Sequence, residues 1–141
     1  MNIIEAQEKI VKEFENLQDW DEKYSHIIKL GRELEAYPEE FRNDKFKVNG
    51  CQSQVWIHAR AKDGKVVFEA DSDAMIVKGL IAILMRVYSG YKPSEILAAS
   101  PDFLKKIGID NHLSPTRKNG LSAMLKQIQM YALAFKTVLE K

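Results

Sequence analysis

Cys51 is the only cysteine of the chain, and its surroundings are those of a residue that could do chemistry. It follows Asn49-Gly50, a dipeptide that tolerates positive φ and is typical of a tight turn, and it precedes the polar run Gln52-Ser53-Gln54. Free cysteine most often packs in a core as a small hydrophobe, whereas a reactive thiol needs partial exposure and polar neighbours. The pattern therefore predicts a reactive thiol at the tip of a loop.

Such a thiol would need activation, because the thiolate is the nucleophile and an ordinary cysteine, with a pKa of about 8.5, is only slightly ionised at neutral pH. A nearby cation, or hydrogen bonds within the loop, would raise the thiolate fraction. Arg117, Arg60 and Lys47 are the candidate cations, and the sequence does not rank them. His112 lies beside a proline turn, where a structural role is favoured over one in proton transfer.

Composition limits the kind of protein that carries this thiol. With 141 residues the chain is predicted to form one domain, residues 1–141, long enough to bury a core. One cysteine excludes an intramolecular disulfide, and the sequence opens with no secretory leader, so we expect a reducing cytoplasm. The apolar run Leu80 to Met85 is far short of a membrane span, and 21 basic residues balance 20 acidic ones. We therefore expect neither a membrane nor a nucleic acid as partner.

The residues after Cys51 alternate as they do in a strand. Val55 to Ala61 place apolar side chains on one face, Asp63-Gly64 is a hairpin turn, and Val66 to Ala70 form the partner strand. Phe46 to Val48 are a possible third strand. We therefore predict an α+β fold in which a small antiparallel sheet of about three strands packs against helices and carries the Cys51 loop.

Helical periodicity flanks this sheet in the sequence. Two helices are predicted before it, the first opening at Asn2 and the second ended by Tyr37-Pro38. After the sheet, Ser72 is the predicted N-cap of an apolar helix over Ala74–Tyr88, with Asp73 in the first turn of that helix. Because this helix is apolar on nearly all sides, we expect it to be central.

The last third of the chain holds a second candidate site. Two short helical segments, over residues 92–98 and 101–106, precede a polar stretch that runs from Asn111 to Gly120. A final helix is predicted to anchor that stretch through one apolar face, made of Leu121, Met124, Leu125, Ile128, Ala132, Phe135 and Leu139.

Four blocks of residues stand in order over most of the chain: Lys23-Tyr24 with Ile27, Ile28 and Leu30-Gly31; Gly50-Cys51-Gln52-Ser53-Gln54-Val55-Trp56; Ser72-Asp73-Ala74 with Ile76-Val77-Lys78-Gly79-Leu80; and His112-Leu113-Ser114-Pro115 with Arg117, Asn119-Gly120-Leu121 and Met124. Together these blocks resemble the SufE family of sulfur acceptors in iron–sulfur cluster assembly, which includes the CsdE proteins.

The resemblance implies a compact fold like that of the IscU scaffold. It also implies that Cys51 takes sulfane sulfur, as a persulfide, from a PLP-dependent cysteine desulfurase of the SufS or CsdA type and stimulates that enzyme. The sulfur would then pass to a scaffold such as SufBCD. On this interpretation the chain is a carrier rather than an enzyme, with no cofactor or metal of its own, and it is commonly a homodimer.

The same resemblance assigns supporting roles around Cys51. Gln52-Ser53-Gln54 support the loop, Asp73 lies in a region associated with desulfurase docking, and Arg117 falls in the other motif loop. Because hydrolysis or reduction would discharge a persulfide, we expect the loop to tuck Cys51 against apolar residues and to swing out on docking. Gly50 would be the hinge.

Two other classes of protein remain as alternatives. A metal or iron–sulfur scaffold would need several ligands, and the chain offers one thiol with the dispersed residues His26, His58 and His112. A single-cysteine thiol enzyme, such as a peroxidase or hydrolase, would need a histidine base and a substrate pocket that the sequence does not display.

Overall fold

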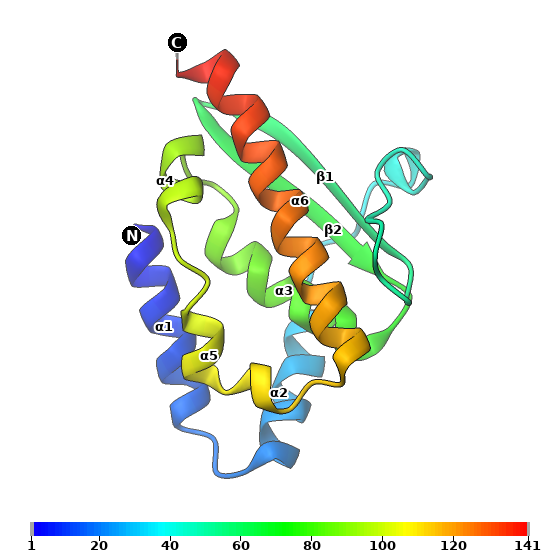
Figure 1. The fold of residues 1–141 in the computed structure, drawn as a ribbon, viewed down its shortest axis with the longest axis vertical. Coiled ribbons are helices and arrows are strands. Elements are labelled where there is room, and N and C mark those ends of the chain that lie inside the picture. Colours follow the sequence, from blue (N-terminus) through cyan, green and yellow to red (C-terminus); the bar gives the residue numbers. More distant parts are fainter. Residues whose placement is uncertain (1, 141) are drawn as a thin grey trace.

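A computed structural model describes residues 2–140 of the chain, apart from the side chain of Asp110 (Figure 1). None of the described helices is both long and apolar enough to cross a membrane. In chain order the elements are α1 (Ile3–Glu15), α2 (Trp20–Arg32), η1 (Glu39–Phe41), β1 (Val55–Lys62), β2 (Lys65–Ser72), α3 (Met75–Tyr88), α4 (Pro93–Ala98), α5 (Phe103–Ile107), η2 (Ile109–Asn111) and α6 (Pro115–Leu139).

The predicted hairpin is confirmed. Strands β1 and β2 pair antiparallel from Val55 opposite Ser72 to Lys62 opposite Lys65, so both strands are slightly longer than predicted. Asp63 and Gly64 have φ values of 54° and 76°. Two successive left-handed residues form the type I′ turn that matches the twist of a hairpin, which explains why Asp-Gly stands there.

The prediction of a third strand is wrong, because the sheet has two strands. Residues 46–48 form one isolated bridge, between Lys47 and Trp56, and the Val48 amide donates to the Val55 carbonyl at 2.8 Å. The chain leaves the sheet at Asn49, before a ladder can form. The pairing is nevertheless useful, since it attaches the residues just before the Cys51 loop to β1.

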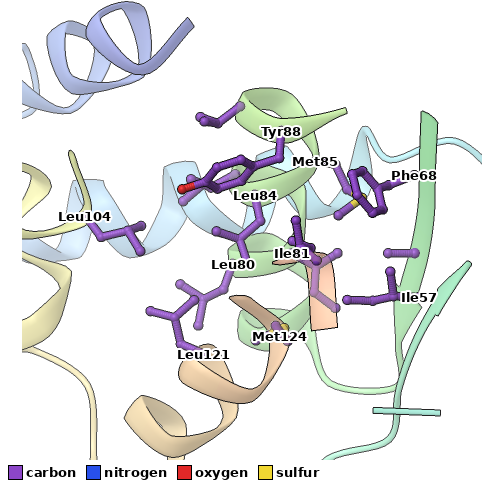
Figure 2. Close-up of a cluster of buried hydrophobic side chains, with 14 of the residues drawn as sticks. Ile57, Phe68, Leu80, Ile81, Leu84, Met85, Tyr88, Leu104, Leu121 and Met124 are labelled. Carbon is purple, nitrogen blue, oxygen red and sulfur yellow. The ribbon is translucent and has the colours of Figure 1, made fainter. Parts of the chain in front are cut away.

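Helix α3 is the centre of the fold, as predicted from its apolar sequence. Figure 2 shows side chains of α3 between those of α6 and those of the hairpin. The residues of α3 that are buried are Val77, Gly79, Leu80, Ile81, Ala82, Ile83, Leu84, Met85, Val87 and Tyr88. Such a helix is stable only when covered on all sides, so its burial fixes where its neighbours must lie.

Both amino-terminal helices begin as predicted. Asn2 and Glu5 form a capping box, in which each side chain accepts from the other residue's amide. The carboxylate of Asp19 accepts from the Glu22 amide at 2.9 Å and caps α2. Helix α2 ends at Arg32, several residues before the predicted stop at Tyr37-Pro38.

The start of α3 differs from the prediction. Ser72 is the last residue of β2 and Ala74 is the N-cap, so Asp73 precedes the helix instead of lying in its first turn. The Ser72 hydroxyl does accept from the Ala74 amide, at 3.2 Å, within the turn. The hairpin extends further than its apolar alternation indicates, which displaces the helix start and frees the Asp73 carboxylate for another contact.

The start of α6 also differs, and this changes the second candidate site. The helix begins at Pro115 rather than Leu121, with Ser114 as N-cap, whose hydroxyl accepts from the Arg117 amide at 3.3 Å. Of the predicted loop, Asn111 to Ser114 precede the helix, and the polar residues Thr116 to Asn119 are exposed in its first turns. Serine followed by proline is a strong helix-start signal, and it outweighs the polarity of the stretch.

The two faces of the hairpin are covered differently. Helices α3 and α6 pack on one face, and the Tyr131 hydroxyl of α6 donates to the Ile57 carbonyl of β1 at 3.0 Å. The segment from residue 37 to residue 48, which lies beyond β1 in Figure 1, covers the other face. There the Arg42 guanidinium lies 4.9 Å from the Trp56 ring centroid and forms a 2.8 Å ion pair with Asp71.

Helices α2 and α3 cross at two glycines. A Cβ on Gly31 would lie 2.8 Å from the Gly79 nitrogen, and a Cβ on Gly79 would overlap the Ile27 carbonyl. The missing side chains let the two backbones touch, so this crossing fixes α2 against the central helix.

We predict that Gly79→Ala lowers the free energy of unfolding by about 3 kcal/mol, because the new methyl group must displace the backbone of α2. Urea denaturation checks this. Ser122→Ala, on the exposed side of α6, is the control and should change stability by less than about 0.5 kcal/mol. A Gly79→Ala variant as stable as that control would show that the crossing is not tight.

Candidate functional site

Cys51 stands in a short loop, residues 49–53, whose two ends are held. Val48 is bonded to Val55 before the loop, and Gln54 is bonded to Asp73 after it. Gly50, one residue before the cysteine, has φ of 94°, a left-handed conformation that glycine adopts without strain. The predicted turn before the thiol is therefore confirmed, and the frame around it is rigid.

The thiol itself is half-buried against α6. Cys51 Sγ lies 3.6 Å from the Gly120 carbonyl oxygen, to which the thiol can donate a weak hydrogen bond. A groove of about 640 Å³ opens beside it. The groove is lined by Cys51, Gln52 and Ser53 of the loop, Ala74, Met75, Ile76, Val77 and Leu80 around the start of α3, and Ser114, Thr116, Arg117, Gly120 and Met124 of α6.

This environment favours the neutral thiol. Burial raises the pKa of the Cys51 thiol above its ordinary value, because the thiolate loses hydration in the partly apolar groove. The Gly120 carbonyl acts in the same direction, since it accepts a hydrogen bond only from the protonated form. The resting structure therefore holds the sulfur in its less nucleophilic state.

The three candidate cations are not equivalent. Arg117 lines the groove from the first turn of α6, at an exposed position where water weakens its field. Arg60 lies 3.6 Å from Glu69 on the hairpin, and Lys47 lies in the bridge to β1. Only Arg117 of the three lines the groove that contains Cys51.

Asp73 has a specific structural task. Its carboxylate accepts from the Gln54 amide at 3.0 Å, and its own amide donates to the Gln54 carbonyl at 3.2 Å. This reciprocal pair closes the carboxyl end of the Cys51 loop onto the turn before α3. Of the polar residues beside Cys51, Gln52 and Gln54 are exposed, whereas Ser53 is partly buried and lines the groove.

His112 anchors the start of α6. Its ring stacks on Trp20 with 3.7 Å between centroids, its Nδ1 lies 3.2 Å from the Gly108 carbonyl, and its own carbonyl accepts from the Tyr24 hydroxyl at 2.7 Å. His112 is not among the residues that line the groove. The His112–Pro115 motif therefore holds α6, and with it the groove wall, against α2.

The histidines lie apart from one another. His26 pairs with Glu13 at 3.0 Å and His58 pairs with Glu69 at 3.2 Å, on different parts of the fold. Among residues 2–140, leaving aside the side chain of Asp110, no three His, Cys, Asp or Glu side chains gather where they could hold a metal ion.

Sequence reasoning missed the apolar and small residues of the site. Met75 is 58% exposed at the groove edge, and Gly120 is buried against the cysteine. Met75 belongs to a stretch that fits a core helix, and Gly120 to a stretch that reads as a loop. Their roles depend on how α3 and α6 lie beside the loop, which no local pattern encodes.

We predict that the rate of Cys51 alkylation by iodoacetamide rises with pH to a midpoint above that of the unfolded chain. The raised pKa of the folded thiol is the reason. The rate is followed by intact mass, and because the chain has one cysteine, each addition reports on Cys51. The same chain in urea is the control, and a native midpoint at or below the urea value would contradict the prediction.

We also predict that Asp73→Ala loosens the loop. Loss of the acceptor for the Gln54 amide should cost about 1 kcal/mol of unfolding free energy and speed alkylation of Cys51 a few-fold. Asp73→Asn keeps a side-chain oxygen that can accept the bond and should stay close to the wild-type rate. Equal rates in the two variants would mean that the Gln54 contact does not hold the loop.

The comparisons with known proteins identify the family of the chain. The family model described as "SufE: Fe-S metabolism associated domain" matches residues 8–132. An uncharacterized SufE-like protein of Synechocystis is 41% identical over 127 residues, covering 90% of this chain and 80% of that one. An uncharacterized SufE-like protein of Rhizobium meliloti is 42% identical over 130 residues, covering 89% and 93%.

A plant relative and a solved structure extend this picture. SufE-like protein 1 of Arabidopsis thaliana, named chloroplastic/mitochondrial, is 42% identical over 127 residues, which are 89% of this chain and 34% of the plant protein. The solution structure of a hypothetical protein from Thermus thermophilus has a TM-score of 0.78 at 22% identity, covering 94% and 96% of the two chains, and so shares the fold. The matched region includes the Cys51 loop, the start of α3 and most of α6, and the chain belongs to the SufE family.

Proposed function

We propose that Cys51 accepts sulfur from a cysteine desulfurase and carries it as a persulfide. Membership of the SufE family supports a role in sulfur transfer with such an enzyme. The observation that carries the proposal is the single thiol at a loop tip, half-buried beside a groove of about 640 Å³. A carrier needs one sulfur that can become nucleophilic and a place that protects its persulfide, and a half-buried thiol beside a groove supports both roles.

The proposed step is an exchange of sulfur between two cysteines. The Cys51 thiolate attacks the outer sulfur of the persulfide on the desulfurase, and a new S–S bond forms. The S–S bond of the donor breaks, its electron pair stays on the donor cysteine, and that thiolate takes up a proton. Nothing is oxidised or reduced overall, so the chain needs no redox cofactor, and the PLP chemistry that makes the donor persulfide belongs to the partner.

Docking must change the loop before this attack. At rest the thiol is half-buried and protonated, so we propose that binding of the desulfurase draws Cys51 out of the groove, with Gly50 as the hinge. Gln52-Ser53-Gln54 would move with it. Asp73, Arg117 and the exposed Met75 lie around the site and are our candidates for the docking surface.

The identity of the partners is a finer part of the proposal. We propose a SufS-type desulfurase as donor, which the chain stimulates by removing its persulfide, and a SufBCD-type scaffold as acceptor; a CsdA-type donor is the alternative. We further propose that the chain works as a homodimer in the cytoplasm, where the reducing environment keeps Cys51 free. Desulfurase pull-down from cells would decide between the two donors.

A thiol enzyme is the competing class. A cysteine hydrolase or peroxidase of that kind relies on a base beside its thiol. The described residues that line the groove include no histidine, and His112 bonds to Gly108 instead. This arrangement favours a carrier that depends on a partner for activation.

We predict that incubation with a SufS-type desulfurase and L-cysteine adds about 32 Da, the mass of one sulfur, to the intact chain. Cys51→Ser should keep its fold, since the change is small and removes no core side chain, and should gain nothing. Desulfurase turnover should rise several-fold with the wild-type chain and not with the variant. A wild-type chain that gains no mass while the desulfurase turns over would defeat the proposal.

A further inference from the structure

The Cys51 loop rests on two small residues of α6. Cys51 Sγ lies 3.6 Å from where a Cβ on Gly120 would be, and a Cβ on Gly50 would lie 3.3 Å from Ala123 Cβ. Gly120 and Ala123 are one helical turn apart, so two successive residues of the loop meet two successive turns of the helix. The loop and the helix are thus in direct contact at the residue that carries the chemistry.

Few hydrogen bonds hold the loop in this position. Within the described part of the chain, one hydrogen bond joins residues 49–53 to another element, and it is the weak bond from the Cys51 thiol to the Gly120 carbonyl at 3.6 Å. The stronger bonds, at Val48 and at Gln54, lie outside these five residues. The position of Cys51 between its two fixed ends therefore depends on the shape of the helix surface beneath it.

The helix does not need these small residues for itself. Gly120 has an ordinary helical backbone, since the glycines with positive φ are Gly50, Gly64, Gly90 and Gly108. Glycine inside a helix is unfavourable relative to alanine, because it has more freedom to lose. A Cβ at position 120 would meet Cys51 Sγ at 3.6 Å, an ordinary contact distance, so the loop lies directly on this turn of the helix and only a side chain larger than alanine would displace it.

We infer that Gly120 and Ala123 form a seat, a patch of small residues on α6 against which the Cys51 loop packs. This seat sets the fraction of time in which the Cys51 thiol is exposed to reagents and partners. They are positioning residues, which act through the place of the loop and touch no substrate. Only the purpose of the seat rests on the proposed function: it would shelter the bound sulfur after Cys51 leaves the donor and before it meets the acceptor. A larger side chain at the seat would lift the loop and expose Cys51 without any partner.

The test is the variant Ala123→Leu, with Ala134→Leu as the matched control. Ala134 is on the exposed side of the same helix, three turns further on, so the control adds the same side chain away from the loop. We expect alkylation of Cys51 by iodoacetamide at neutral pH to be about tenfold faster in Ala123→Leu and unchanged in Ala134→Leu. A tenfold change in the alkylation rate is larger than the variation expected between protein preparations.

The pH profile separates this effect from general loosening of the fold. Lifting the loop relieves the burial that raises the thiol pKa, so the midpoint of alkylation should fall toward that of the unfolded chain while urea denaturation remains cooperative. A folded Ala123→Leu chain with a wild-type rate and midpoint, or with a slower rate, would overturn the inference. If that variant does not fold, the smaller substitution Ala123→Val decides by the same measurement, because it too adds bulk beneath Gly50, and an unchanged rate there overturns the inference equally.

The alkylation experiment needs no desulfurase, so its outcome is independent of whether the chain accepts sulfur. Where the wild-type persulfide does form, we expect reduced glutathione to discharge it several-fold faster in Ala123→Leu than in Ala134→Leu. Failure of the wild-type chain to gain sulfur would reject the proposed function and leave the seat to be judged by alkylation alone. Equal discharge rates in the two variants would reject the sheltering role of the seat.

Discussion

The burial of α3 is the constraint on which the rest of the structure depends. This helix is apolar on nearly all sides, so it is stable only when the hairpin, α2 and α6 cover it together. The Gly31 and Gly79 crossing brings α2 into backbone contact, and Figure 2 shows Leu121 and Met124 of α6 packed against the same helix. Covering α3 therefore fixes the relative positions of β1 and α6, and the Cys51 loop lies between them.

A rigid frame around a weakly held loop follows from this arrangement. The frame is anchored by residues far from the thiol, such as the His112 and Trp20 stack that holds the start of α6. The loop has fixed ends and one weak hydrogen bond of its own, from Cys51. The movement that we propose for residues 49–53 would therefore leave the core in place.

The sequence predicts the parts of the fold that local chemistry determines. The Asp63-Gly64 turn, the Asn2 cap and the apolar α3 helix are each encoded by neighbouring residues, and each is confirmed. The candidate site is also local, because a lone cysteine after Asn49-Gly50 can be recognised from the sequence, and its reactivity stays a prediction. The recognition of the SufE family from four short blocks is confirmed as well.

The errors concern residues whose roles depend on distant neighbours. Asp73 is a plausible helix-start acid by sequence, yet its carboxylate bonds to Gln54 across the loop. The stretch before Leu121 is polar because Ser114 to Asn119 are all exposed at the start of α6, and polarity alone does not distinguish an exposed helix turn from a loop. Gly120 belongs to one of the blocks that resemble the SufE family, but its contact with Cys51 spans 69 residues of chain, and no local pattern indicates it.

The raised pKa of Cys51 and the small residues beneath it both bear on how fast the thiol reacts. A sulfur carrier must react quickly with one partner and slowly with everything else, and a single fixed thiol environment cannot do both. A half-buried thiol that donates to a backbone carbonyl is slow by default. On the proposed function, reactivity comes from leaving that position, and selectivity then depends on how weakly α6 holds the loop.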